Sequence, residues 1–214
     1  MKRNTDLDFI RAILIILMIL IHIVSFGNAY PQLKAGILSF MMPTFLIITG
    51  YLVNIEKTGR QMGNYLKCLA LPYVIMVTGF SVLSYYMPVR DGITELSLSQ
   101  ICEKIFVTSI GPYWFIQTMI ICGTLYYFCF RGRNWNDLRK NYTKRDTYAS
   151  LFVFALTLLL ISETPALSAS AAAYYFIGVV IRQSKTEWNK LFRHESFAII
   201  LWIYLLNHDD WYDW

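Results

Sequence analysis

Long stretches without a charged residue constrain this chain more than any other feature of its sequence. The charge-free runs are 12–33, 35–55, 68–89, 105–130, 147–162, 164–181 and 196–208. A helix that crosses the hydrocarbon core of a bilayer needs about 20 mostly apolar residues, and the longer runs reach that length. The strands of a membrane barrel instead alternate over about 10 residues. The sequence therefore predicts an all-α fold, a polytopic transmembrane helix bundle.

Six complete spans and one incomplete span are predicted for this bundle. They cover roughly 9–26, 35–53, 69–87, 112–130, 148–162, 170–182 and, for the incomplete span, 197–208. Composition agrees, because only 15% of the residues are charged, whereas soluble domains average about 25%. We therefore expect one membrane-embedded domain over residues 1–214, with six to seven helices. Between the third and fourth spans, residues 97–107 are expected to form a short amphipathic helix after a serine cap.

The basic residues indicate how the bundle is oriented. If the N-terminus is cytoplasmic, 15 of the 19 Lys and Arg residues fall in cytoplasmic segments, and only Lys34, Arg90 and Lys104 fall on the other side. This distribution follows the positive-inside rule. We therefore predict a cytoplasmic N-terminus and a multi-pass protein of the inner or plasma membrane. The same cytoplasmic Lys and Arg residues explain the net charge of +5, and they are expected to attract the anionic headgroups of the lipid bilayer. No nucleic-acid partner is predicted.

Three ionisable residues stand out in the first predicted span, because such groups are costly inside a membrane. Arg11 and His22 are 11 residues apart, which places them within about 20° of one face and about 16 Å apart along a helix. Asp8 lies three residues before Arg11 and can pair with it. An imidazole in this position can exchange protons near neutral pH. The alternative is structural: Asp8 and Arg11 anchor the helix at the interface, and His22 bonds to a neighbouring helix.

No metal site is predicted. The four cysteines form no CxxC pair and suit helix contacts as small apolar side chains. The acidic group after His208 is interpreted as a solvated terminus.

Five stretches, in order along the chain, resemble the acyltransferase-3 family of integral membrane acyltransferases. Residues 5–22 contain the family's pattern of Arg, ten residues and His, matched by Arg11 and His22. Similar to later family signatures are 43–52 (Pro-Thr-Phe-Leu-Ile-Ile-Thr-Gly-Tyr-Leu), 65–73 (Tyr-Leu-Lys-Cys-Leu-Ala-Leu-Pro-Tyr), 111–116 (Gly-Pro-Tyr-Trp-Phe-Ile) and 174–178 (Tyr-Tyr-Phe-Ile-Gly). The resemblance covers about residues 5–180.

The resemblance implies an acyltransferase that takes an acyl group, most commonly acetyl, from acyl-CoA as co-substrate. The acceptor would be a hydroxyl of a sugar, as in O-acetylation of a surface glycan or lipid-linked sugar during polysaccharide modification. By the same resemblance, His22 and Arg11 are the catalytic residues. Arg11 also belongs to the donor site, together with Lys67.

Four further residues are predicted to bind the substrate: Asp8, Tyr51, Tyr113 and Trp114. For Tyr113 and Trp114, anchoring at the membrane interface is the alternative role. For Tyr51, a place in a close contact between helices is expected.

Two departures from the family pattern keep other functions open. The family usually has two arginines, three residues apart, near Lys67, and here Asn64 or Cys68 stands where the other arginine would be. The family also has about ten helices, whereas six to seven are predicted here. We therefore expect that this chain lacks the family's last helices. The alternatives are an inactive or truncated membrane partner protein and a transporter-like pathway for protons or sugars.

Overall fold

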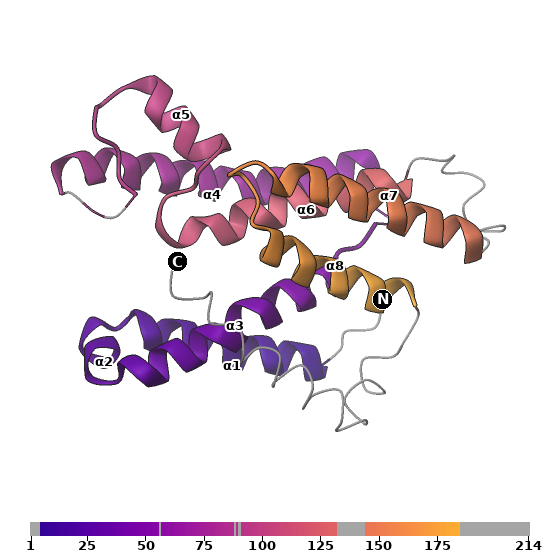
Figure 1. The fold of residues 1–214 in the computed structure, drawn as a ribbon, viewed down its shortest axis with the longest axis horizontal. Helices are drawn as coiled ribbons and strands as arrows, with labels where there is room; N and C mark the ends of the chain where they lie inside the picture. The colour runs from indigo at the N-terminus through magenta and orange to yellow at the C-terminus, as the bar shows by residue number, and fades with distance from the viewer. Residues whose placement is uncertain (1–4, 56, 88, 90, 132–143, 185–214) are drawn as a thin grey trace. The chain divides into compact units, whose positions relative to one another are not determined.

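The structure, a computed structural model, describes residues 5–55, 57–87, 89, 91–131 and 144–184, and within these ranges every regular element is a helix (Figure 1). The all-α class predicted from the sequence is confirmed. The incomplete span predicted at 197–208 and the group after His208 lie outside the described residues. The number of membrane passes and the cytoplasmic N-terminus stay predictions.

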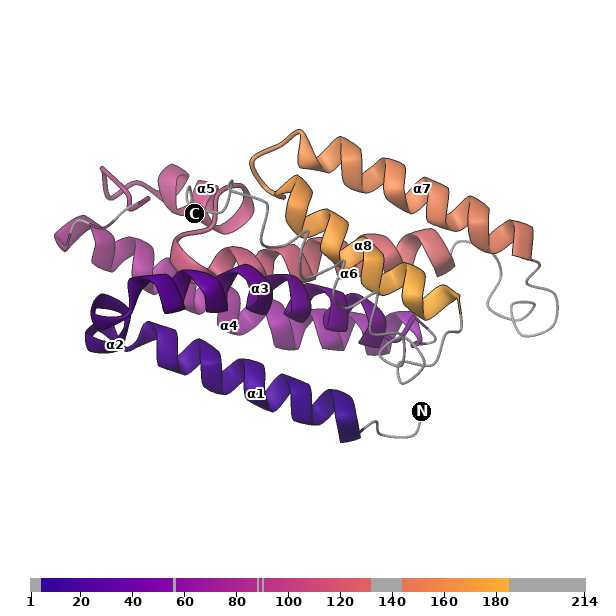
Figure 2. The ribbon, with the colours of Figure 1, turned by 60° about the horizontal axis from the view of Figure 1, so that its bottom comes forward.

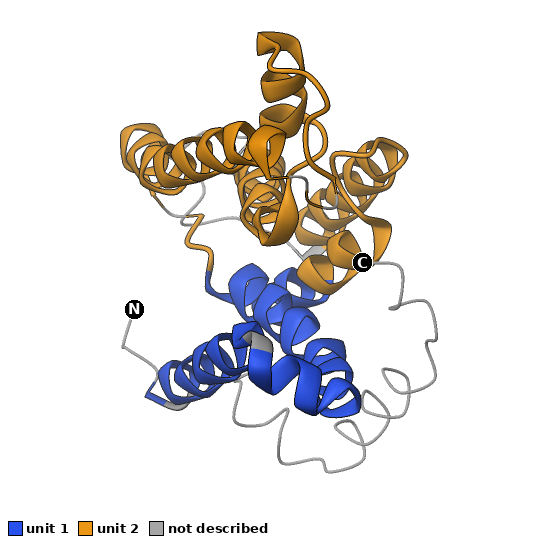
Figure 3. Ribbon diagram, turned by 90° about the vertical axis from the view of Figure 1, so that its left-hand side faces the viewer, with its two compact units in different colours: residues 1–52, 177–214 blue, residues 53–176 orange. Residues whose placement is uncertain are grey.

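The helices divide between two compact units, coloured separately in Figure 3. Unit 1 is residues 1–52 and 177–214, and unit 2 is residues 53–176. The single domain predicted over 1–214 stays a prediction, and each unit is described by itself.

Unit 1 contains an antiparallel pair of helices joined by one short helix. They are α1 (Thr5–His22), α2 (Val24–Ala29) and α3 (Pro31–Leu52). Figure 2 shows α1 and α3 side by side, with α2 at the turn between them. The last residues of α8 (Ala169–Gln183), from Ile177 onward, also belong to this unit.

Unit 2 holds most of the remaining helices. They are α4 (Gly59–Tyr86), α5 (Leu98–Phe106), the short 3-10 helix η1 (Gly111–Tyr113), α6 (Trp114–Arg131), α7 (Lys144–Ser162) and the first half of α8. Helix α6 packs against α4 on one side and α7 on another. Helix α5 confirms the predicted amphipathic segment, and the Ser97 side chain caps it by accepting a hydrogen bond from the Ser99 amide.

Four helical segments are long and apolar enough to cross a membrane. They are Pro31–Leu52, Gly59–Tyr86, Gly111–Phe130 and Arg145–Ser162. Helix α1 is outside this set because its 18 residues include three charged ones, and α8 is outside it because it has only 15 residues. The apolar helices support a membrane protein.

The first helix ends earlier than the span predicted at 9–26. It stops at His22, because Ile23 adopts an extended backbone (φ −73°, ψ 110°) before α2 begins. The Ile23 amide bonds to the carbonyl of Leu20, three residues back, which tightens the last turn. The break places His22 at the end of α1 and not in its middle.

Helix α4 starts at Gly59, ten residues before the third predicted span, 69–87. A capping box fixes this start: the Thr58 hydroxyl accepts from the Gln61 amide, and the Gln61 side chain accepts from the Thr58 amide. The first ten residues of α4 include two basic residues, Arg60 and Lys67, so hydropathy alone did not reveal them. The 28 residues of α4 extend about 42 Å, more than a hydrocarbon core of about 30 Å.

Candidate functional site

Helix α1 packs on α3 through a narrow ridge of aliphatic side chains. Leu7, Leu14 and Ile21 recur every seven residues and are 1–3% exposed. A seven-residue repeat drifts by only about 20° per step on an α-helix, so the three side chains follow one line. The rest of α1 is largely exposed, and this leaves its polar residues outside the contact with α3.

Arg11 and His22 are both exposed on α1. Because α1 is continuous from Thr5 to His22, the two residues share one face within about 20°, as the spacing predicts. They are about 16 Å apart along the axis. Asp8 is half-buried, and its pairing with Arg11 stays a prediction.

The imidazole of His22 is oriented by its own helix. Its Nδ1 lies 2.7 Å from the carbonyl oxygen of Met18. A carbonyl oxygen can only accept, so Nδ1 carries the proton and donates it in this hydrogen bond. The other ring nitrogen, Nε2, then has its lone pair available and points away from the α1 backbone. This is the tautomer that a general base needs.

Tyr51 lies where α3 and α8 approach each other closely within unit 1. Gly178 of α8 faces the α3 backbone so closely that an added Cβ would lie 2.9 Å from the Tyr51 nitrogen and would overlap the Ile47 carbonyl. One turn further on, the Arg182 guanidinium lies over the Tyr51 ring, 5.6 Å from its centre. The close helix contact expected at Tyr51 is therefore present, and Gly178 makes it possible.

His22 and Tyr51 lie at opposite ends of unit 1. His22 precedes the α2 turn, whereas Tyr51 comes 20 residues after Pro31, or about 30 Å along α3. Because α1 and α3 are antiparallel, the start of α1 lies at the same end of unit 1 as the end of α3 (Figure 2). Asp8 and Arg11 are therefore at the same end as Tyr51. The structure thus separates a group of cationic and aromatic residues at one end of unit 1 from the imidazole at the other.

Unit 2 separates its predicted site residues in the same way. Lys67 is exposed in the first half of α4. Tyr113 contacts Phe80 of the same helix, with ring centres 5.4 Å apart, and Trp114 follows it at the start of α6. Thirteen residues, or about 20 Å, separate Lys67 from Phe80 along α4. Lys67 and the Tyr113–Trp114 pair therefore do not form one binding site within unit 2.

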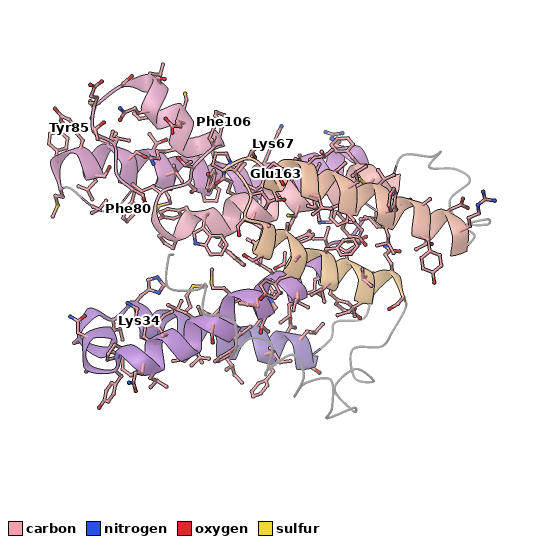
Figure 4. All side chains as sticks on the ribbon, viewed as in Figure 1. Lys34, Lys67, Phe80, Tyr85, Phe106 and Glu163 are labelled. Carbon is pink, nitrogen blue, oxygen red and sulfur yellow. The ribbon has the colours of Figure 1, made fainter. Side chains whose placement is uncertain are left out.

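The end of unit 2 that carries Tyr113, here the Tyr113 end, is held by side-chain hydrogen bonds to α5. The Tyr73 hydroxyl donates to the Ile105 carbonyl at 2.8 Å. The Gln117 amide donates to the carbonyls of Phe106 and Val107 at 3.2 Å each. These three carbonyls close the C-terminal turn of α5, where the helix itself offers no donors. Figure 4 shows Phe106 between Tyr85 and Lys67 along the length of α4.

The other end of unit 2, here the Lys57 end, carries residues that the sequence did not single out. The Lys57 ammonium lies 4.2 Å from the centre of the Tyr65 ring, and the Lys57 carbonyl accepts a hydrogen bond from the Tyr127 hydroxyl at 3.1 Å. Residues 65–73 were matched to a family signature, but the role of Lys57 depends on the fold. Its position is set by Tyr127, which is 70 residues away in sequence.

Comparison with known proteins identifies relatives of the chain. The family model of an acyltransferase domain, that of the acyltransferase-3 family, matches residues 4–207. The nodulation protein NolL of Sinorhizobium fredii is 27% identical over 216 residues, which cover 92% of this chain and 54% of NolL. The chain thus spans about half the length of this curated relative. No solved structure matches it.

Proposed function

Since the chain belongs to the acyltransferase-3 family, we propose that it takes part in acyl transfer from a coenzyme A thioester to a hydroxyl of a surface glycan or lipid-linked sugar. Acetyl is the acyl group proposed. The observation that carries the proposal is the pair of Arg11 and His22 on one exposed face of α1, with Nε2 of His22 available as a base.

In the proposed reaction His22 acts on the acceptor. Its Nε2 takes the proton from the sugar hydroxyl while the hydroxyl oxygen attacks the thioester carbonyl carbon. The carbon–sulfur bond then breaks, and the coenzyme A thiolate leaves and receives a proton from the imidazolium. The hydrogen bond from Nδ1 to the Met18 carbonyl keeps the ring in place through both proton transfers.

Arg11 and Lys67 are proposed to bind the phosphates of the donor. A guanidinium offers several fixed donors to a phosphate, whereas the ammonium of Lys67 acts as a point charge. Arg11 and His22 are about 16 Å apart, so a donor with phosphates at Arg11 and a thioester at His22 must be long and thin. The pantetheine arm of coenzyme A has that shape. Asp8, Tyr51, Tyr113 and Trp114 remain proposed substrate residues.

The test is the transfer of radiolabel from [14C]acetyl-CoA into the glycan and glycolipid fraction of membranes that contain the full chain. Asn at position 22 can still donate to the Met18 carbonyl but offers no basic nitrogen, so His22→Asn should lower transfer at least about 100-fold. The matched control is Ser25→Ala, an exposed position one turn away in α2, which should transfer like the wild type.

Wild-type membranes without label in that fraction would contradict acyl transfer to a sugar. Full transfer by His22→Asn would contradict the role of His22 and leave the transfer itself intact.

A further inference from the structure

Helix α5 runs back along α4 toward its middle (Figure 1). The chain before α5 is held near the end of α4, where the Ile93 amide donates to the Ser84 hydroxyl at 3.0 Å. The last turn of α5 is held further back, where the Tyr73 hydroxyl donates to the Ile105 carbonyl. Tyr73 and Ser84 are 11 residues, or about 16 Å, apart along α4. The nine residues of α5, about 14 Å long, cover most of that distance.

The length of α4 determines how deep α5 reaches. Helix α4 is about 42 Å long, about 12 Å more than a hydrocarbon core of about 30 Å. If α4 crosses the membrane, as its length and hydropathy allow, at most about 12 Å of it protrudes on either side. Tyr73 is about 20 Å from both ends of α4 and therefore lies within the core. The turn of α5 that Tyr73 holds then lies below the membrane surface.

This last turn of α5 is equipped for apolar surroundings. The final carbonyls of a helix have no partner within the helix, and a backbone group without a partner is costly in lipid. The carbonyls of Ile105, Phe106 and Val107 instead accept hydrogen bonds from the side chains of Tyr73 and Gln117. Neighbouring helices thus satisfy the end of α5 that lies deepest.

The exposed face of α5 is apolar. Leu98, Cys102 and Phe106 follow one another every four residues and form one strip, here the outer strip. Leu98 is 78% exposed, Phe106 is 72% exposed, and Cys102 is exposed as well. Ile105 instead packs against the buried core around Tyr73. The core of unit 2 therefore leaves the outer strip uncovered.

Lipid is the partner that fits the outer strip. Among the described residues only 17% of the apolar part of α4 is buried, so lipid covers most of that helix when it crosses a membrane. Helix α5 packs on α4 and shares this environment. The charged neighbours of the strip tolerate it: Lys104 donates to the Thr108 hydroxyl, and Glu103 can reach toward water because helical side chains lean toward the N-terminus.

We propose that α5 re-enters the bilayer with its C-terminal turn first, and that lipid covers the outer strip. Phe106 then lies deepest, among the acyl chains, and Leu98, about 12 Å away along the helix, lies nearest the headgroups. No anionic lipid is required, because the three side chains of the strip carry no charge. The placement of α5 is independent of acyl transfer and goes beyond the proposed function.

The experiment measures the accessibility of spin labels on the full chain in phosphatidylcholine nanodiscs. Oxygen concentrates among the acyl chains and a water-soluble nickel chelate stays outside, so their collision rates distinguish lipid, water and protein around a label. Cys68 and Cys129 are replaced by Ser, whereas Cys122 stays because it is fully buried. One label at a time is attached to the outer strip, at Cys102 or, after Cys102→Ser, at Leu98→Cys or Phe106→Cys.

Oxygen should collide with labels at 102 and 106 more often than the nickel chelate does, and its excess should grow from 98 through 102 to 106. The matched control is Ser99→Cys, an exposed position beside the strip, which should meet the nickel chelate more often than Leu98→Cys does. Collisions mainly with the nickel chelate at 102 and 106 would place α5 in water and overturn the proposal. Labels that neither reagent reaches would also overturn it, because protein would then cover the strip.

A second measurement leaves every cysteine in place. Phe106→Asp puts a carboxylate where lipid is proposed to lie, so the melting temperature in nanodiscs should fall by about 2–4 °C. Ser99→Asp, on the polar border of the strip, should melt like the wild type. An unchanged melting temperature for Phe106→Asp would contradict contact between the outer strip and lipid.

Discussion

The two ends of unit 2 each bury a tyrosine hydroxyl, but only one of the two hydroxyls is used by the fold. At the Tyr113 end, Tyr73 donates to the carbonyl of Ile105. Among the described residues at the Lys57 end, Tyr175 has no acceptor. Both side chains are almost fully buried, at 4% and 0% exposure. Burial alone therefore does not show whether a tyrosine hydroxyl is used by the fold, whereas its hydrogen-bond partner does.

The difference follows from what each end must hold. The C-terminal turn of α5 ends beside α4 and α6, and its carbonyls need donors from outside the helix. Tyr73 and Gln117 supply those donors. Among the described residues, no acceptor lies within hydrogen-bond distance of the Tyr175 hydroxyl. Substitutions at Gln117, Gly123, Tyr73 and Tyr175 test this contrast.

Gln117→Leu should be the most destabilising of these changes. It removes the two part-buried hydrogen bonds to the carbonyls of Phe106 and Val107, which together are worth about 1–3 kcal/mol. We expect a loss of about 3 kcal/mol in the free energy of unfolding, measured by denaturant titration in micelles. Ile121→Leu, a conservative change on the same helix, is the control. A loss no larger than that of the control would contradict a structural role for Gln117.

Gly123→Val should cost about 2 kcal/mol, because a branched side chain overfills the space occupied by the Tyr175 hydroxyl. Gly123→Ala should differ from wild type by less than about 1 kcal/mol, since its Cβ would meet the hydroxyl at 3.4 Å, an ordinary contact. Thermal unfolding of both variants measures the difference. If Ala and Val unfold at the same temperature, the space beside Gly123 is not filled as described.

Tyr73→Phe should lower the free energy of unfolding by about 1 kcal/mol, because it removes one hydrogen bond and leaves the Ile105 carbonyl without a donor. Hydrogen exchange should locate the change, with faster exchange at the C-terminal turn of α5 and unchanged rates in α7. Slower or unchanged exchange in α5 would mean that Tyr73 does not hold this helix.

Tyr175→Phe should have the smallest effect on stability, with a free energy of unfolding equal to or slightly above that of the wild type in the absence of ligand. The same denaturant titration compares it directly with Tyr73→Phe. A loss as large as that of Tyr73→Phe would show that the Tyr175 hydroxyl already has a structural partner, and the contrast between the two ends would disappear.

Much of the fold could be predicted from the sequence, because a membrane helix is determined by the hydropathy and hydrogen bonds of residues that are close in sequence. The charge-free runs predicted α3 and α6 to α8 to within a few residues, and Ser97 predicted the start of α5. The start of α4 was missed because its first turns are polar. The sequence did contain a signal for it, since Thr58 and Gln61 form a capping box. The end of α1 at His22 was missed because Ile23, which breaks the helix, is neither proline nor glycine.

The candidate site was predictable only where a motif sits on one helix. The shared face of Arg11 and His22 follows from spacing alone. The hydrogen bond that sets the His22 tautomer depends on the rotamer of the side chain, and Tyr175 lies beside Gly123, which is 52 positions away in sequence. Contacts between residues 50 or more positions apart depend on how the helices meet, which a single sequence does not specify.

The most direct test of the acyl-transfer proposal is imidazole rescue of a variant that lacks the base. His22 is exposed at the end of α1, so a small molecule can reach the position of its ring. Transfer from [14C]acetyl-CoA is measured for His22→Ala and Arg11→Ala, each with and without imidazole in the buffer. Imidazole should restore measurable transfer to His22→Ala and none to Arg11→Ala. Wild-type transfer by His22→Ala without imidazole would contradict the role of His22 as the base.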